Sequence, residues 1–118
     1  QIRGLEVSAH FFVRRDGELV QFVDADARAW HAGASCWRGR DNCNDFSVGI
    51  ELEGTDDLPY ATAQYQRLCA TIKALRRGIP SLAKAPLVGH CDIAPGRKTD
   101  PGPAFDWSRL ERLLARRR

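Results

Sequence analysis

Two short segments near the start of the chain, residues 7–14 and 18–23, are rich in apolar, β-branched and aromatic residues. This composition is typical of β-strands. The sequence between them contains Asp16-Gly17, a pair that favours the tight turn of a hairpin. The pattern therefore predicts a β-hairpin over residues 7–23.

Two further strands are predicted downstream. Residues 46–52 form an apolar segment interrupted by one carboxylate, Glu51, and residues 87–90 predict a short buried strand that ends at a histidine. Residues 25–45 show no strand or helix period. A loop of that length in a small domain usually either has a function or is disordered, and its aromatic and cysteine content argues against disorder.

A helical period of 3.6 residues appears over residues 60–77. Thr62 is a suitable N-cap, and Gly78 with Pro80 is expected to end the helix. The apolar stripe of this predicted helix consists of Tyr65, Leu68, Cys69, Ile72 and Leu75.

A last helix is predicted after Asp106, which is suited to cap it. Phe105 and Leu110 stand at the N′ and N4 positions of a hydrophobic staple. Leu110, Leu113 and Leu114 are expected to form its inner face. Strands mixed with two helices, without regular βα alternation, predict one α/β or α+β domain over residues 1–118, with helices flanking a mixed central sheet.

The composition is that of an ordinary globular protein, with 43% apolar and 28% charged residues. No apolar run approaches the roughly 18 residues that a membrane span needs, so no membrane association is expected. The net charge of +3 is small, and the basic residues are scattered apart from the last three, which suit a solvated helix end. Nucleic-acid binding is therefore a weak alternative.

The four cysteines, Cys36, Cys43, Cys69 and Cys91, have no zinc-finger spacing. Cys69 falls on the apolar stripe of a predicted helix, where a free cysteine acts as a small hydrophobe. We therefore expect four reduced thiols and a cytoplasmic protein. The chain contains no methionine, which predicts that Gln1 is not the start of the gene product.

The densest group of polar residues follows the predicted strand that ends at His90. The loop after it contains Pro95 and Gly96 and is expected to fold back, so that Asp100 returns beside His90. Imidazole and carboxylate are ligands that Zn²⁺ prefers. Lys98 lies two residues from Asp100, on the same side of an extended chain, where its ammonium group could face a developing oxyanion.

The group from His90 to Asp100 also has a purely structural interpretation, because a single histidine at a strand end is often only hydrogen-bonded.

Glu51 and Glu53 share one face of their predicted strand, and Glu51 is suited to act as a general base if it is buried. The alternative to a catalytic role is that their strand is an edge strand on which Glu51 and Glu53 are merely exposed to solvent. His31 could line a pocket or anchor its long loop, whereas His10 is predicted to be a hydrogen-bonded core residue.

Taken together, these segments resemble the AmpD-like N-acetylmuramoyl-L-alanine amidases, a cytosolic family related to phage amidase lysozymes and peptidoglycan recognition proteins. The resemblance extends in order over residues 7–107. It is carried by Val7-Ser-Ala-His-Phe11, Arg14-Arg-Asp-Gly-Glu18, Arg28-Ala-Trp-His-Ala-Gly33, Cys43-Asn-Asp-Phe-Ser-Val-Gly-Ile-Glu-Leu-Glu-Gly-Thr-Asp56, Gly89-His-Cys-Asp-Ile-Ala-Pro-Gly-Arg-Lys-Thr-Asp-Pro-Gly-Pro103 and Phe105-Asp-Trp107.

The resemblance implies a mixed sheet flanked by helices, with one zinc ion at its edge. It also implies hydrolysis of the amide that joins anhydro-N-acetylmuramic acid to L-alanine, during recycling of cell-wall peptidoglycan fragments (muropeptides). We expect the protein to be a monomer. By motif position, His90 and Asp100 correspond to zinc ligands. Glu51 corresponds to the carboxylate that activates the attacking water, and Lys98 to the cation that stabilises the oxyanion. His31 and Asn44 fall on segments that line the substrate groove in the family.

The chain departs from the family pattern in two ways. The first zinc ligand of the family is a histidine on an N-terminal strand, and no segment here corresponds to that strand. We therefore expect the third ligand to lie upstream of Gln1. Glu6 and Asn42 stand where arginine is expected, which weakens the expected recognition of the peptide carboxylates.

A non-catalytic module that binds peptidoglycan fragments is the alternative function, since the recognition branch of the superfamily binds without cutting. The presence of Glu51, Lys98, His90 and Asp100 together favours the enzyme, because a binding module does not need all four.

Overall fold

The computed structural model describes residues 9–22, 36–37, 40–41, 48–54, 58–93 and 100–116. Within these residues the backbone forms short strands, two longer helices and two short helical turns. In chain order they are β1 (Phe11–Val13), β2 (Leu19–Gln21), β3 (Cys36–Trp37), β4 (Arg40–Asp41), β5 (Ile50–Leu52), α1 (Thr62–Gly78), the 3-10 turn η2 (Pro80–Leu82), α2 (His90–Ile93) and α3 (Trp107–Ala115).

A mixed three-stranded sheet in the order β2-β1-β5 forms the centre of the molecule. β1 pairs antiparallel with β2 and parallel with β5, while β3 and β4 form a separate two-stranded pair. The predicted hairpin is confirmed, because β1 and β2 are joined by a turn in which Gly17 has a φ of +91°. Gly17 donates its N–H to the Arg14 carbonyl, which closes the turn. Only glycine adopts this φ without steric cost, so the Asp-Gly pair specified the turn.

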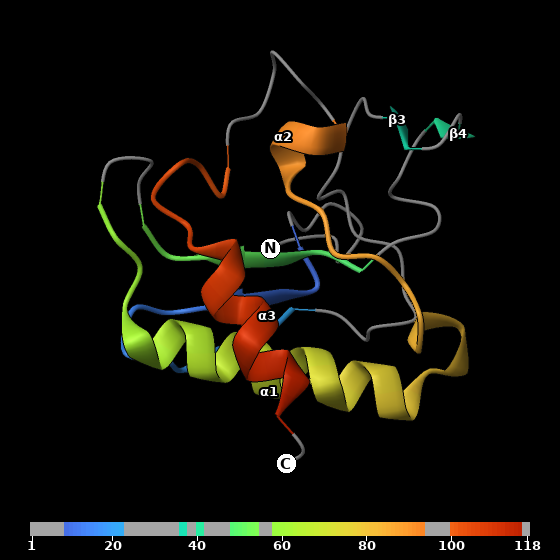
Figure 1. The fold of residues 1–118 in the computed structure, drawn as a ribbon, viewed down its shortest axis with the longest axis horizontal. Coiled ribbons are helices and arrows are strands. Elements are labelled where there is room, and N and C mark those ends of the chain that lie inside the picture. Colours follow the sequence, from blue (N-terminus) through green and yellow to red (C-terminus); the bar gives the residue numbers. More distant parts are fainter. Residues whose placement is uncertain are drawn as a thin grey trace.

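Helices α1 and α3 pack together on one side of this sheet, and α2 lies on the side away from α1 (Figure 1). The hydrophobic core between α1, α3 and β5 contains Tyr60, Tyr65, Leu68, Cys69, Ile72, Phe105 and Leu110, all buried. Ile50 and Leu52 of β5 pack against this core. The mixed sheet flanked by helices agrees with the fold class expected from the sequence.

The ends of the helices agree with the sequence pattern in most respects. Asp106 caps α3, since its carboxylate accepts a hydrogen bond from the Arg109 N–H at 3.0 Å. Helix α1 ends at Gly78, as expected. The prediction of Thr62 as N-cap is wrong by one residue: Ala61 holds the extended N-cap conformation, and the Gln64 side chain accepts the Ala61 N–H at 2.9 Å.

The prediction of a buried strand at residues 87–90 is also wrong. Residues 85–89 have no strand pairing among the described residues, and His90 opens the short helix α2. Leu87 and Val88 are 38% and 36% exposed. A short apolar segment becomes a strand only when another strand supplies hydrogen bonds to its backbone, which the local sequence does not determine.

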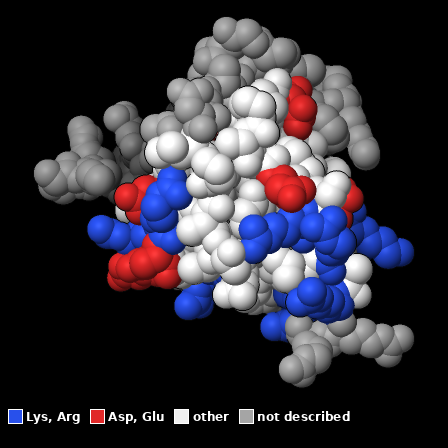
Figure 2. Space-filling model, turned by 60° about the vertical axis from the view of Figure 1, so that its left-hand side comes forward, with Lys and Arg blue, Asp and Glu red and all other residues white. Residues whose placement is uncertain are grey.

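The described surface is charged but mixed in sign. On the face drawn in Figure 2, acidic side chains lie beside the basic ones, with uncharged surface between them. The basic side chains gather mainly in one group on the right of this view, with acidic side chains at its upper edge, and a smaller group on the left is mixed with acidic side chains. In the part of the chain that the structure describes, no helix has the length and apolar character needed to cross a membrane.

Leu110→Ala is expected to destabilise the domain by about 2–5 kcal/mol, the usual cost of deleting a buried leucine side chain. Leu110 is 1% exposed and packs in the core, so the deleted atoms leave a cavity. Urea denaturation measures the loss, with the partly buried Leu114→Ala as the matched control. An equal loss of stability in Leu110→Ala and Leu114→Ala would contradict the inference that Leu110 contributes more to the core than Leu114.

Candidate active site

Glu51 occupies the middle of β5 and is partly buried. Its β1 partner in the sheet register is Phe12. Because side chains alternate along a strand, and Ile50 and Leu52 pack against the core beside α1, Glu51 points to the opposite face. That face lies on the side of the sheet where α2 is found (Figure 1).

Glu53, the second glutamate of this segment, has a different environment. It is exposed, and its Oε1 accepts the Arg15 backbone N–H at 2.8 Å. This bond ties the end of the β5 segment to the hairpin turn. Of the two glutamates, Glu51 is therefore the one suited to chemistry and Glu53 the one with a structural contact.

Asp100 lies beside the start of α2. The Cys91 N–H donates to the Asp100 carbonyl at 3.1 Å. A Cβ on Gly89 would lie 2.7 Å from Pro101 Cδ and 3.2 Å from the Asp100 carbonyl oxygen, so Gly89 packs directly against Asp100-Pro101. The backbones of His90 and Asp100 are thus neighbours, as the sequence suggested; the side chain of His90 lies outside the described part.

The Asp100-Pro101 segment is anchored to the hydrophobic core. The Tyr60 hydroxyl donates to the Pro101 carbonyl at 2.9 Å, and the Tyr60 ring packs edge-on against Phe105 with ring centroids 5.7 Å apart. The Asp100-Pro101 peptide bond is cis. The position of Asp100 is consequently set by packing that reaches the core as well as by its contact with Cys91.

Negative charge gathers at the start of α2. Burial is the main reason that the pKa of the Cys91 thiol is raised, and the carboxylates of Asp92 and Asp100 raise it further. Asp92 also accepts the Gly89 N–H through Oδ2 at 2.8 Å. Burial disfavours a charge of either sign, whereas the two carboxylates disfavour a thiolate and favour a cation at this place.

The structure also tests the predictions made for His10 and for the cysteines. His10 is fully buried, and its Nδ1 accepts the Gly49 N–H at 3.1 Å, which confirms the prediction of a hydrogen-bonded core histidine. Cys69 and Cys91 are free thiols, as expected. Lys98, His31, Asn44, Glu6 and Asn42, together with the side chains of Cys36 and Cys43, lie outside the described residues.

The described residues contain no group of three or more His, Cys, Asp or Glu side chains placed to hold a metal ion. They supply Asp100, and the backbone of His90 beside it, for the expected metal centre. The other ligands expected from the sequence, the His90 imidazole and a third group, lie outside the described part.

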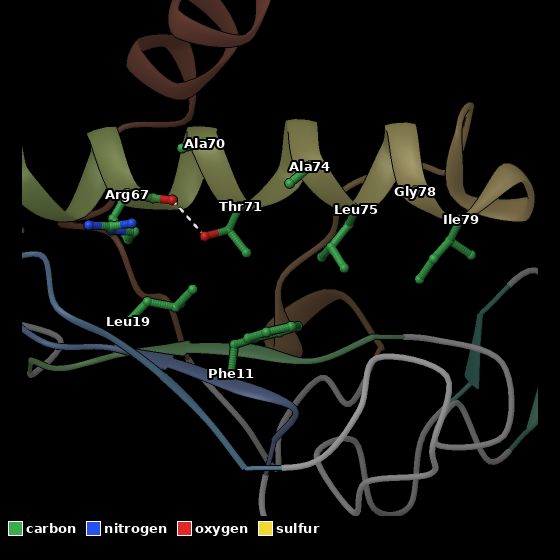
Figure 3. Close-up of a pocket in the computed structure, with 9 residues that line it drawn as sticks. All are labelled: Phe11, Leu19, Arg67, Ala70, Thr71, Ala74, Leu75, Gly78 and Ile79. Carbon is green, nitrogen blue, oxygen red and sulfur yellow. Dashed lines mark hydrogen bonds between the residues drawn. The ribbon is translucent and has the colours of Figure 1, made fainter.

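A groove of about 350 Å³ lies between α1 and the hairpin strands, lined mainly by apolar side chains (Figure 3). Phe11 and Leu19 point from the sheet toward α1 (Figure 3). Leu75 of α1 and Ile79, which follows that helix, line the same groove. Phe11 pairs with Ile50, whose side chain faces the core, so the groove opens on the face opposite to Glu51. We therefore do not assign the candidate active site to this groove.

Gln64 was not predicted from the sequence as a functional or core residue, yet it is fully buried at the start of α1. Its Nε2 donates to the Glu53 carbonyl at 2.8 Å and to the Val13 carbonyl at 3.4 Å. The only local signal is that glutamine stands at the N3 position, where Glu or Gln often bonds back to the N-cap.

Comparison with known proteins gives consistent results. A family model described as N-acetylmuramoyl-L-alanine amidase matches residues 1–103. The 1,6-anhydro-N-acetylmuramyl-L-alanine amidase AmpD of Escherichia coli (strain K12) is 60% identical over 116 residues, covering 98% of this chain and 63% of the relative.

Two solved structures are similar to the structure of this chain. The crystal structure of a selenomethionine derivative of AmpD superimposes with a TM-score of 0.87 at 60% identity, covering 92% of this chain and 60% of the other. The amidase AmiD from Escherichia coli, in complex with anhydro-N-acetylmuramic acid-L-Ala-D-γ-Glu-L-Lys, gives a TM-score of 0.80 at 37% identity. That match covers 91% of this chain and 48% of the other. The chain thus spans about three fifths of the length of its AmpD relatives.

Proposed function

Because the chain belongs to the N-acetylmuramoyl-L-alanine amidase family, we propose that it provides most of the active site of an amidase acting on anhydromuramyl peptides. The reaction is hydrolysis of the amide between the lactyl group of anhydro-N-acetylmuramic acid and L-alanine. The observation that carries the proposal is the return of Asp100 to His90, on a domain whose β5 presents Glu51 on the face away from α1. A substrate of this class was bound in the AmiD structure.

The residues present fit a zinc ion. His90 and Asp100 offer an imidazole and a carboxylate, and the charge at the start of α2 favours a cation. Catalytic zinc has three protein ligands, and we propose that the third is a histidine from a strand upstream of Gln1. Among the described residues β5 is one of the two edge strands of the sheet, the other being β2, so its outer side is suited to receive such a strand.

The side chains of this chain supply the acid–base and charge-stabilising steps. Zinc, when bound, polarises the amide carbonyl and assists ionisation of the attacking water. The Glu51 carboxylate takes a proton from that water as it attacks the carbonyl carbon, and then delivers it to the L-alanine nitrogen as the C–N bond breaks. The Lys98 ammonium stabilises the negative charge that develops on the carbonyl oxygen. The free carboxylate of the muramic acid and the amine of the peptide are the products.

Recognition of the substrate rests on residues outside the described part. We propose that His31 and Asn44 line the groove that holds the muramyl peptide. We further propose that the protein works as a monomer in the cytoplasm, where peptidoglycan fragments are recycled.

The test is removal and restoration of the metal in the intact protein. A strong chelator is expected to abolish hydrolysis of anhydromuramyl-tripeptide, and added zinc to restore it, because no other group replaces the Lewis acid. The readout is the released tripeptide, separated by chromatography, with metal content measured on the same samples. Full activity in a preparation without metal would disprove the zinc mechanism. Tight binding without any hydrolysis by the zinc-loaded protein would instead indicate a recognition module.

A further inference from the structure

We infer that His10 and Gln64 are positioning residues for Glu51: two buried polar side chains that hold the β5 segment at its two ends. The inference rests on the proposed role of Glu51 as general base and adds two residues to the machinery of that reaction. Both side chains are fully buried, and each makes a hydrogen bond to the backbone of a residue that flanks Glu51, Gly49 for His10 and Glu53 for Gln64.

His10 holds the start of the segment. Its Nδ1 accepts the Gly49 N–H at 3.1 Å, so the ring proton of the neutral imidazole is carried by Nε2. The Gly49 carbonyl in turn accepts the backbone N–H groups of His10 at 3.0 Å and Phe11 at 3.2 Å. Gly49 is buried, so without the imidazole its N–H would lose this partner in a place that water does not readily reach. The imidazole therefore couples the start of β5 to β1.

Gln64 holds the end of the segment. Its Nε2 donates to the Glu53 carbonyl at 2.8 Å and to the Val13 carbonyl at 3.4 Å, and its Oε1 accepts the Ala61 N–H at 2.9 Å. The Glu53 N–H also donates to the Val13 carbonyl at 2.9 Å. One buried amide thus joins β5, β1 and the start of α1.

Between these two attachments lie only Ile50, Glu51 and Leu52. A strand this short has few ladder hydrogen bonds, and a slip of one residue in its pairing would turn Glu51 toward the core. A displacement of about 1 Å in a reacting group can lower a rate on the order of 100-fold. The fixed attachments at Gly49 and Glu53 therefore determine on which face of the sheet the Glu51 carboxylate lies and its position along the strand.

The experiment compares amide replacements at position 10 in the intact protein, loaded with zinc. In His10→Asn the amide oxygen takes the place of Nδ1 and keeps the acceptor for Gly49. In His10→Gln the amide lies farther from the backbone, near the place of Nε2, and the acceptor is lost. Gln64→Met, of similar size but without a hydrogen-bonding amide, is the independent variant at the other end.

We expect His10→Gln and Gln64→Met to lower kcat by about 10-fold to 100-fold, with KM and zinc content near wild type. His10→Asn is expected to keep most of the wild-type kcat. Amide hydrogen exchange of a peptide covering residues 48–53 should accelerate in His10→Gln and Gln64→Met but not in His10→Asn. A residue that only stabilised the fold would lower the melting temperature without this separation of kcat from KM.

Glu51→Gln is measured in parallel, so that the two proposals fail separately. If Glu51→Gln keeps wild-type turnover, the proposed general base is wrong. If Glu51→Gln is inactive while folded His10→Gln and Gln64→Met keep wild-type kcat, the positioning role is overturned. If His10→Gln does not fold, the other two variants test the positioning role. Wild-type kcat in Gln64→Met would overturn it, and so would a large loss of kcat in folded His10→Asn.

Discussion

Glu51→Gln is expected to lower the turnover of the intact protein by roughly 100-fold or more, while its melting temperature and zinc content stay near those of the wild type. The carboxylate is the group that accepts the proton of the attacking water, and an amide of the same shape cannot accept it. Glu51 is partly buried in mid-strand and points away from the hydrophobic core, so the substitution changes its chemistry more than its packing.

The matched control is Glu53→Gln, on the same segment and two residues away. Glu53 is exposed, and its Oε1 accepts the Arg15 N–H, a bond that the oxygen of a glutamine preserves. This variant is expected to keep turnover within about threefold of wild type, as surface substitutions usually change little. Steady-state kinetics on anhydromuramyl-tripeptide measures both. Equal losses in the two variants would mean that Glu51 is only a solvated strand residue.

Asp100→Asn is expected to remove most of the bound zinc and nearly all turnover. Even residues that only support zinc ligands cost about 10-fold to 100-fold in affinity when they are replaced, so the loss of a ligand should cost at least as much. The backbone of Asp100 is held by the Cys91 N–H, and Tyr60 anchors the adjoining Pro101, so a neutral amide at this position should leave the loop in place.

Asp92→Asn provides the comparison for this variant. Asp92 is a nearby carboxylate in the short helix α2, and its bond from the Gly89 N–H can be kept by the asparagine oxygen. It should retain zinc and most of its turnover, because no ligand role is assigned to it. Metal analysis after dialysis against a weak chelator, together with kinetics, separates the two variants. Full zinc content in Asp100→Asn would show that Asp100 is not a ligand.

Local sequence features determined several elements of this protein without help from the rest of the fold. The Asp16-Gly17 pair fixed the hairpin because glycine alone takes its positive φ without cost. The spacing of apolar residues fixed α1 and α3, whose stripes meet in one core, and Asp106 fixed the start of α3 through its own carboxylate. The alternation of Ile50, Glu51 and Leu52 already assigned Glu51 to the face opposite the core-facing side chains.

The tertiary structure decided what depends on partners distant in the sequence. Residues 87–90 have strand composition, but no described strand pairs with residues 85–89, so His90 begins a helical turn instead. Arg109 of α3 donates to the Thr62 hydroxyl at 2.7 Å, while Gln64 bonds to the Ala61 N–H at the N-cap.

Which polar side chains support Glu51 was likewise decided by the packing. His10 and Gln64 lie 39 and 11 residues from the backbone groups that they bind at the ends of β5. Chain composition and periodicity report which side chains tend to be buried, but a hydrogen bond between distant residues exists only once the fold has brought donor and acceptor together.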